Sequence, residues 1–322
     1  MSLKHSKFAK PVVVAIGGNA ITREFEEGNI YQQFANTRRS LTGVAEMISE
    51  GHRLVLTHGN GPQIGNSLIR VEASRHLVPP IPLGVLVADT EGGMGYMIEQ
   101  SLQNMLHRRK IRRKAATILT QVIVDRNDPS ISNPTKFVGP FYTKNEAYKI
   151  HRERGWILKE NAGRGWRRVV PSPYPLEIVE KELICELIEH DVVVIACGGG
   201  GIPVYVEEDG TYEGVDGVID KDLAAAVLGR DVQAQQLIIL TSVDRVAIHF
   251  GMKQQVDLDR LSVSEAKIHL SQGEFPPGSM GPKIEAAIQF LEQGGREVLI
   301  TSVERMTDGR RGATGTRILP DK

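Results

Sequence analysis

Cysteine is scarce in this sequence. Only Cys185 and Cys197 occur among 322 residues, and they neither form a C-x-x-C motif nor combine with the nine histidines at a standard metal-ligand spacing. This argues against a disulfide-stabilised secreted scaffold and against the common zinc modules. We therefore predict a protein without a metal site of its own, in the reducing environment of the cytoplasm.

Long hydrophobic runs and an excess of one charge are also missing. No apolar stretch is long enough to span a bilayer, and the run Val12–Ile16 after the basic residues 1–10 is far shorter than the core of a signal peptide. Lys+Arg and Asp+Glu both number 39, so the formal net charge is zero. No global field attracts nucleic acid or an anionic membrane, and we expect neither as a partner. Any phosphate site must be local.

Aromatic residues make up 5% of the chain and hydrophobic residues 41%, enough for one large core or for two lobes that share a sheet. Short β-branched runs alternate with longer amphipathic stretches, which predicts a mostly parallel α/β sheet. The predicted strands are Val12–Ile16, Leu54–Thr57, Ala116–Leu119, Val192–Ala196, Leu237–Leu240 and Val298–Thr301. The predicted helices are Thr37–Glu50, Gly95–Arg108, Ile178–His190 and Pro282–Gln293, and Ser262 and Glu265 have capping-box spacing.

One region, Asp125–Pro175, interrupts the alternation. It is rich in proline, glycine and charge, and it holds both tryptophans, Trp156 and Trp166. A structureless loop of that length is uncommon in a compact domain, so we predict an inserted subdomain or lid. Its basic and aromatic residues also allow RNA binding as an alternative, but interspersed acidic residues and the lack of an RNA-binding motif argue against it.

Glycine-rich segments follow three of the predicted strands: Gly17-Gly18-Asn19, His58-Gly59-Asn60-Gly61-Pro62 and Cys197-Gly198-Gly199-Gly200-Gly201. The carboxyl ends of parallel strands meet at one edge of a sheet, where α/β proteins bind their ligands. Glycine lets the backbone approach a ligand and turn its N–H groups toward a phosphate. A single loop of this kind is often only a turn, whereas three together predict a phosphate site.

The familiar nucleotide-binding motifs do not fit. No G-x-x-x-x-G-K-[ST] sequence occurs, and the glycines from Gly59 to Gly65 have the wrong spacing for a dinucleotide fingerprint. A kinase with this sequence is neither a P-loop enzyme nor a protein kinase.

Three lysines have unusual neighbours. Lys136 follows Asn-Pro-Thr, Lys221 lies between two aspartates, and Lys283 begins a predicted helix after a Gly-Ser-Met-Gly-Pro sequence. Phosphoryl transfer needs positioning and positive charge more than covalent chemistry. A hydroxyl acceptor would also need a general base, whereas a carboxylate or carbamate oxygen is already an anion. The lysines therefore favour an anionic acceptor, against the alternative of ordinary surface ion pairs.

In order along the chain, these segments resemble the signature sequences of carbamate kinase, in the amino-acid-kinase superfamily. The matching segments are Gly17–Ala20, Thr57–Gln63, Asn133–Lys136, Gly163–Pro173, Cys197–Pro203, Ile219–Asp222 and Pro277–Lys283. The resemblance extends from the first strand to near the C-terminus, and the set is far more specific than any one loop.

The resemblance implies a three-layer αβα sandwich with a mostly parallel central sheet and a protruding subdomain at about 126–175. It implies an N-terminal lobe (1–190) with the acceptor and phosphoryl site, and a C-terminal nucleotide-binding lobe (191–322). It also implies a cytoplasmic homodimer that acts on a small-molecule substrate. The reaction would be the reversible one of ATP with carbamate to give ADP and carbamoyl phosphate, with Mg²⁺ carried on the nucleotide.

The same resemblance implies roles for individual residues. The catalytic residues would be Lys136, Lys221, Asp222 and Lys283, with Asp222 orienting the lysines. The acceptor and the phosphoryl group would contact Gly17, Gly18, Asn19, Gly59, Asn60, Gly61, Gly199 and Gly200. The nucleotide would contact Thr241, Val243, Asp244, Gly278, Ser279 and Met280.

One segment departs from the family pattern. Ala88-Asp89-Thr90-Glu91-Gly92 places two acidic residues, Asp89 and Glu91, where carbamate kinases usually have a neutral pair, and Phe137 replaces a common proline. We consider three hypotheses for the acidic pair. The two residues lie at an interface or cap a helix near Gly93; they select an acceptor that carries a cationic or amide group; or the chain is a nucleotide-binding regulator without turnover. The intact lysines argue against the last.

Overall fold

The computed structural model describes residues 10–23, 25–161 and 163–321, without the side chain of Asn19. Its central sheet contains β1 (Val12–Ile16), β2 (Leu54–His58), β3 (Ala115–Thr117), β9 (Val193–Ile195), β12 (Gln236–Thr241), β15 (Arg260–Ser262), β16 (Glu297–Ser302) and β17 (Thr316–Leu319). The strand order is β15-β17-β16-β12-β1-β2-β9-β3. All neighbouring pairs are parallel except β16 and β17. The predicted α/β sheet is confirmed.

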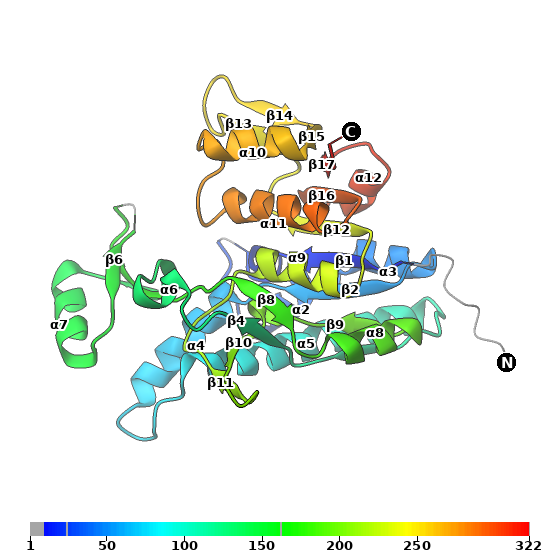
Figure 1. Ribbon diagram of the computed structural model, residues 1–322. Coiled ribbons are helices and arrows are strands. Elements are labelled where there is room, and N and C mark those ends of the chain that lie inside the picture. The colour runs from blue at the N-terminus through cyan, green and yellow to red at the C-terminus, as the bar shows by residue number, and fades with distance from the viewer. Residues whose placement is uncertain (1–9, 24, 162, 322) are drawn as a thin grey trace.

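Side chains along the central strands alternate between two hydrophobic cores, because successive residues of a strand point to opposite faces. In β1, Val13 and Ala15 belong to one core, and Val12, Val14 and Ile16 belong to the other. The first core includes α8 (Lys181–Glu189), α9 (Lys221–Asp231), α10 (Val263–Ser271) and α11 (Met280–Glu292). The second includes α1 (Gly18–Ile21), α3 (Thr42–Ser49), α5 (Leu83–Arg108) and α12 (Met306–Arg310). The sheet is thus the middle of a three-layer αβα sandwich, as predicted (Figure 1).

Smaller sheets lie around this sandwich, and the sequence patterns did not predict them. A four-stranded sheet has the order β11-β10-β4-β8 and contains β4 (Gln121–Val124), β8 (Pro175–Ile178), β10 (Ile202–Val206) and β11 (Tyr212–Gly214). A hairpin pairs β13 (Val246–Ile248) with β14 (Val256–Leu258). Several of these strands are only three or four residues long and partly exposed, which makes them weak signals in the sequence.

The interrupting region forms a unit of its own. It contains α6 (Pro129–Ser132), β5 (Lys136–Tyr142), α7 (Lys144–Arg154), β6 (Leu158–Glu160) and β7 (Trp166–Val170), with the sheet order β5-β7-β6. Figure 1 shows α7 and β6 reaching away from the main body. The unit contacts the body through β5, which lies against α4 (Gly61–Ser74).

The arginines of this unit lie over its aromatic rings. The guanidinium of Arg168 is 4.1 Å from the ring centroid of Trp156, and those of Arg164 and Arg167 are each 5.0 Å from that of Phe141. Such cation–π contacts stabilise the subdomain and occupy the ring faces on which RNA bases would stack. The composition that suggested RNA binding therefore has a structural explanation.

Three predicted helices have different limits in the structure. Thr37–Glu50 is two helices, α2 (Ile30–Ser40) and α3, separated at Leu41. The helix predicted from Gly95 begins at Leu83, because buried Leu86 and Val87 extend its apolar face toward the N-terminus. The helix predicted from Ile178 begins at Lys181, since Ile178 pairs with Val122 in β4.

The predicted capping box at the start of α10 is confirmed: Ser262 and Glu265 each accept a hydrogen bond from the other's backbone N–H. Among the helices of the described residues, none has the length and apolar character needed to cross a membrane. The central sheet is continuous through both predicted lobes, and a division near residue 190 stays a prediction.

Candidate active site

A cleft of about 500 Å³ opens at the carboxyl edge of the central sheet. The loops that follow β1, β2 and β9 meet there because these three strands are parallel and β2 lies between the other two. The described residues that line the cleft include Gly17, Gly18, Gly59, Asn60, Gly61, Lys136, Gly199, Lys221, Asp222, Thr241, Gly278, Ser279 and Lys283. The structure thus brings together most of the residues that the sequence singled out.

The glycines are needed for the close approach of the loops to each other. A Cβ atom on Gly17 would lie 2.9 Å from the carbonyl oxygen of Leu240, and one on Gly59 would lie 2.9 Å from the backbone nitrogen of Gly18. Any side chain at these positions would force the loops apart and widen the cleft.

Gly200 and Asn19 stand apart from the other predicted contact residues. Gly200 is not among the described residues that line the cleft, and a Cβ there would lie 2.5 Å from the carbonyl oxygen of Ile219. Its observed role is packing of the turn against the loop before α9. The side chain of Asn19 lies outside the described structure, although its backbone belongs to α1.

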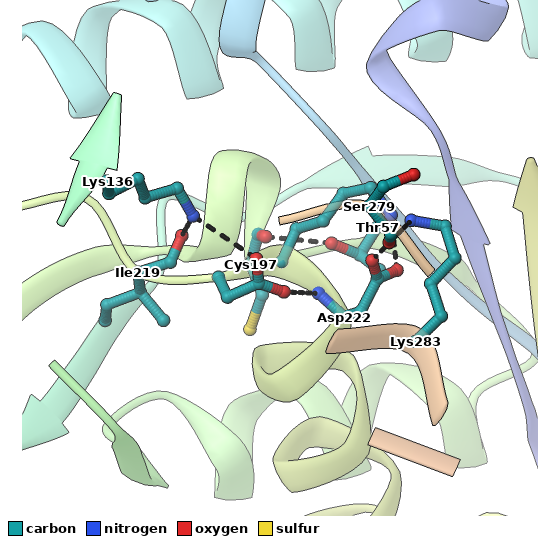
Figure 2. A network of polar contacts seen from close by, with 9 residues as sticks. Thr57, Lys136, Cys197, Ile219, Asp222, Ser279 and Lys283 are labelled. Carbon is teal, nitrogen blue, oxygen red and sulfur yellow. Dashed lines mark hydrogen bonds and ion pairs between the residues drawn. The ribbon is translucent and has the colours of Figure 1, made fainter. Parts of the chain in front are cut away.

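Asp222 joins two lysines from different helices. Its Oδ1 accepts a hydrogen bond from Lys221 Nζ at 2.5 Å, and its Oδ2 accepts one from Lys283 Nζ at 3.0 Å. The start of α9 is set by Asp220, whose side chain accepts from the backbone nitrogen of Asp222 at 2.9 Å. Figure 2 shows Lys283 and Ser279 on the same side of Asp222. One carboxylate therefore holds two ammonium groups at the cleft.

The three charges influence one another's protonation. Burial raises the pKa of Asp222, but the charges of Lys221 and Lys283 outweigh burial and lower it below its ordinary value. Burial also lowers the pKa of the Lys221 ammonium, with a further contribution from Lys283, while Asp222 opposes this change. The carboxylate stays ionised at neutral pH, and the cluster carries one net positive charge when both lysines are protonated.

Lys136 reaches the cleft from the protruding subdomain. It begins β5, and its Nζ donates to the carbonyl oxygen of Ile219 at 3.0 Å and lies 3.4 Å from Asp220 Oδ2 (Figure 2). The subdomain is held there by a hydrogen bond from the backbone nitrogen of Val218 to the carbonyl oxygen of Pro171. Lys136 therefore lies beside the loop that leads into Lys221.

The predicted nucleotide contacts are divided between two environments. Thr241, Gly278 and Ser279 line the cleft, whereas Val243, Asp244 and Met280 are not among the described lining residues. Asp244 accepts a hydrogen bond from Ser302 Oγ at 2.5 Å, and Met280 packs against the hydrophobic core beneath α11.

Arg23 and Glu304 also line the cleft and form an ion pair with each other. The sequence offered no signal for this pair, because the two residues are 281 positions apart and each looks like an ordinary surface charge. Phe137 and Val218 form an apolar part of the lining of the same cleft.

Each carboxylate among the described lining residues is engaged by a cation. Asp220 pairs with Lys136, Asp222 with Lys221 and Lys283, and Glu304 with Arg23. This pairing favours an acceptor that needs no carboxylate base. No group of three or more His, Cys, Asp or Glu side chains in the described part of the chain could hold a metal ion. The cleft can thus position and neutralise anionic oxygens.

The acidic pair of the departing segment lies within α5. Asp89 is exposed, and Glu91 is buried with 1% exposure; neither lines the cleft. The prediction that they cap a helix is wrong, because α5 begins at Leu83 and both residues lie in its interior. The hypothesis that they contact a cationic or amide group of the acceptor lacks support, because neither residue lines the cleft. An interface role for Asp89 stays untested.

Comparisons with known proteins match this architecture. Residues 10–302 match the model of the amino acid kinase family. A carbamate kinase of Pyrococcus furiosus is 46% identical over 97% of this chain and 99% of its own length. The carbamate kinase-like protein YahI of Escherichia coli is 47% identical over 96% of this chain and 98% of its own length.

A solved structure gives the same result. The carbamate kinase of Giardia lamblia bound to AMP-PNP has a TM-score of 0.90 and 40% sequence identity, covering 97% of this chain and 99% of its own. The chain therefore belongs to the amino acid kinase family, and within it to the carbamate kinases.

Proposed function

We propose that this protein is an ATP-dependent carbamate kinase. An oxygen of carbamate attacks the γ-phosphorus of ATP, the bond from phosphorus to the bridging oxygen of ADP breaks, and the products are carbamoyl phosphate and ADP. The reaction is reversible. The observation that carries the proposal is a cleft with three lysines in which every described carboxylate is already paired, because this suits an acceptor that is an anion before it reacts.

The lysines divide the work of charge neutralisation. Lys221 and Lys283, held by the two oxygens of Asp222, neutralise the oxygens of the phosphoryl group as it moves. Lys136, carried by the subdomain, does so from beside the loop that leads into Lys221. The backbone N–H groups of Gly18, Asn19 and Gly61 hold the acceptor and the phosphoryl group, with Asn60 and Gly199 beside them. The N–H groups of Gly17 and Gly59 already donate to the carbonyl oxygens of Leu240 and Ile16, so these two glycines serve the close approach of the backbone instead.

The nucleotide lies over Thr241, Gly278 and Ser279, with Mg²⁺ on its phosphates. The carbamate kinase of Giardia lamblia, which is similar to this chain, binds AMP-PNP, and this supports a nucleotide site here. We also propose a cytoplasmic homodimer with an acceptor lobe in residues 1–190 and a nucleotide lobe in residues 191–322.

The test is a coupled assay of ATP formation from ADP and carbamoyl phosphate. Lys221→Ala and Lys136→Ala are expected to lower kcat by about 100- to 1,000-fold, the usual effect of removing one group that stabilises transition-state charge. Lys149→Ala serves as the control, since Lys149 is exposed on α7 of the subdomain and distant from the cleft lining.

An inactive wild-type protein that still binds ADP would overturn the carbamate assignment. ATP consumption with small carboxylates would then identify a related kinase with another acceptor, and no turnover with any of them would identify a nucleotide-binding regulator.

A further inference from the structure

Glu91 is a buried carboxyl group that the proposed reaction does not use. It projects from α5 between the ends of two neighbouring strands, β9 and β3. Its Oε1 accepts a hydrogen bond from the backbone nitrogen of Gly198 at 2.9 Å, and its Oε2 accepts one from that of Thr120 at 3.3 Å. One side chain thus connects the turn after β9 to the loop after β3.

The turn that Glu91 holds has no free space around it. A Cβ atom on Gly198 would lie 2.3 Å from His58 Nε2, and one on Gly199 would lie 2.1 Å from Asn60 Nδ2. Gly199 and Asn60 both line the cleft. Because their atoms are in contact, a shift of the turn would displace both residues at once.

Helix α5 also holds Asn60, the residue that Gly199 contacts. Asn60 Nδ2 donates to Thr90 Oγ1 at 3.0 Å, and Thr90 precedes Glu91 in α5. Thr90 in turn donates to the carbonyl oxygens of Leu86 and Val87 within the helix. Two consecutive residues of α5 therefore position two adjacent elements of the cleft wall.

We propose that Glu91 is a positioning residue for the acceptor side of the cleft: its two hydrogen bonds fix the Gly198–Gly201 turn against Asn60. The inference rests on the proposed function for the identity of the acceptor. Its structural part, the anchoring of the turn, does not depend on the reaction.

The groups around Glu91 favour its neutral form. Burial raises the pKa of Glu91 to about 8, although hydrogen bonds from Thr120 and Gly198 oppose this change. Glu180, at the start of α8, raises it further, and the buried thiol of Cys197 supplies no positive charge.

His58, at the end of β2, is the remaining titratable neighbour. Burial lowers the pKa of its imidazole to about 4, and the charge of Lys221 contributes to this decrease. The histidine is therefore neutral near pH 7. Lys221 donates its hydrogen bond to Asp222 rather than to either of these groups. Glu91→Gln keeps the shape of the side chain and does not titrate, but its amide nitrogen cannot accept a hydrogen bond, so it retains only one of the bonds from Gly198 and Thr120.

The position of the turn predicts which kinetic constant changes when the turn is displaced. In the sheet, β9 is separated from β12 by β2 and β1, so Gly198 lies three strand spacings, roughly 14 Å, from Thr241 on the nucleotide side. A disturbed turn should therefore weaken binding of carbamoyl phosphate and leave ADP binding intact.

The experiment compares Glu91→Leu, Glu91→Gln and Asp89→Asn with wild type. Asp89 is an exposed acidic residue two positions away on the same helix, which makes it a matched control. Glu91→Leu is expected to raise the KM for carbamoyl phosphate at least tenfold and to change the KM for ADP less than twofold. At pH 7, Asp89→Asn is expected to stay within twofold of wild type, and Glu91→Gln, which loses one of the two hydrogen bonds, is expected to lie between wild type and Glu91→Leu.

Two further measurements separate positioning from general destabilisation. Between pH 7 and 9 the KM of wild type for carbamoyl phosphate should rise relative to that of Glu91→Gln, because only the native side chain becomes an anion near the acceptor. Hydrogen–deuterium exchange in peptides covering residues 197–202 should be at least tenfold faster in Glu91→Leu, with residues 236–241 unchanged.

The outcomes that overturn the inference are distinct from failure of the reaction. Equal exchange in Glu91→Leu and wild type, or parallel increases in both KM values, would refute positioning by Glu91. If Glu91→Leu does not fold, exchange in residues 118–121 and 197–202 of Glu91→Gln that equals wild type would refute it, because the amide can accept only one of the two bonds. A wild type without turnover would overturn the proposed function, while the exchange measurement would still decide the role of Glu91.

Discussion

Asp222 is the residue on which the charge arrangement of the cleft depends. It is buried, with 3% exposure, and both of its oxygens accept hydrogen bonds from lysines. Removing one partner of a buried ionic cluster leaves the other charges uncompensated, which typically costs about 3–5 kcal/mol. An isolated surface pair would cost far less.

We therefore expect Asp222→Asn to lower kcat about 100-fold or more and to lower the thermal unfolding temperature. The amide keeps the shape of the side chain but loses its charge. Assays of ATP formation and thermal denaturation measure the two effects. Asp257→Asn is the control, because Asp257 is exposed in β14. Full activity of Asp222→Asn would contradict the role of the carboxylate in holding the lysines.

Glu91 gives the stability of the protein a pH dependence of defined sign. Burial raises its pKa from an ordinary value of 4.5 to about 8, so the folded state binds more protons than the unfolded state between these values. The contribution to stability is complete below pH 4.5 and is lost as the pH rises through 8. The unfolding free energy of wild type should thus fall with pH, relative to Glu91→Gln.

Urea denaturation of wild type and Glu91→Gln at several pH values from 5 to 8.5 measures this difference. The unfolding free energy of wild type minus that of Glu91→Gln, whatever its value at pH 5, should decrease steadily as the pH rises. A difference that stays constant across the range would mean that Glu91 does not change its protonation on unfolding.

At the scale of elements, the turn between β9 and β10 is the least replaceable. Gly199 has a φ of 70°, which favours glycine, and a Cβ there would also lie 2.1 Å from Asn60 Nδ2. Gly210 has a similar backbone, with a φ of 84°, but nothing lies within 4 Å of its Cβ position. A side chain would therefore strain the backbone at both positions, but it would clash with a neighbouring residue only at Gly199.

Gly199→Ala is expected to destabilise the protein by about 1–3 kcal/mol more than Gly210→Ala, the usual cost of overpacking. It should also lower kcat/KM at least tenfold, because Asn60 lines the cleft. Chemical denaturation and steady-state kinetics test this expectation. Equal effects of the two substitutions would mean that backbone strain alone accounts for the loss.

Some elements escaped prediction for identifiable reasons. The N-terminal part of α5 contains Gly84, Gly92 and Gly93, and glycine lowers helix propensity. The helix forms there because Leu86 and Val87 are buried in the folded protein. The subdomain strands pair only with each other, and their mixed polar sequences carry no central-strand pattern.

At the scale of the whole molecule, one edge of the central sheet ends in β3. The backbone groups of Thr117 and Ala115 at this edge bond to the side chains of Glu99 and Gln103 in α5, and beside them Tyr96 and Leu119 are 58% and 52% exposed. We expect the proposed homodimer to form at this edge.

Sedimentation or light scattering should then give wild type twice the chain mass of 35.5 kDa. Leu119→Glu should shift the protein to the mass of one chain, because it places a charge in an apolar contact. Leu77→Glu, at a residue that is 75% exposed after α4, should leave the mass unchanged. A wild-type monomer would refute the dimer, and a dimeric Leu119→Glu variant would place the interface elsewhere.

Local sequence patterns were enough to predict the parallel sheet, the three glycine-rich loops at its carboxyl edge and the identity of the lysines. These features depend on local patterns: periodic burial, glycine at strand ends and motif order. The folded structure was needed to see that Asp222 joins Lys221 to Lys283, that Arg23 pairs with Glu304, and that Glu91 points inward to the turn while Asp89 is exposed. Each of these contacts joins segments that are far apart in the chain, and the direction of a side chain on a helix follows from the packing of the whole fold.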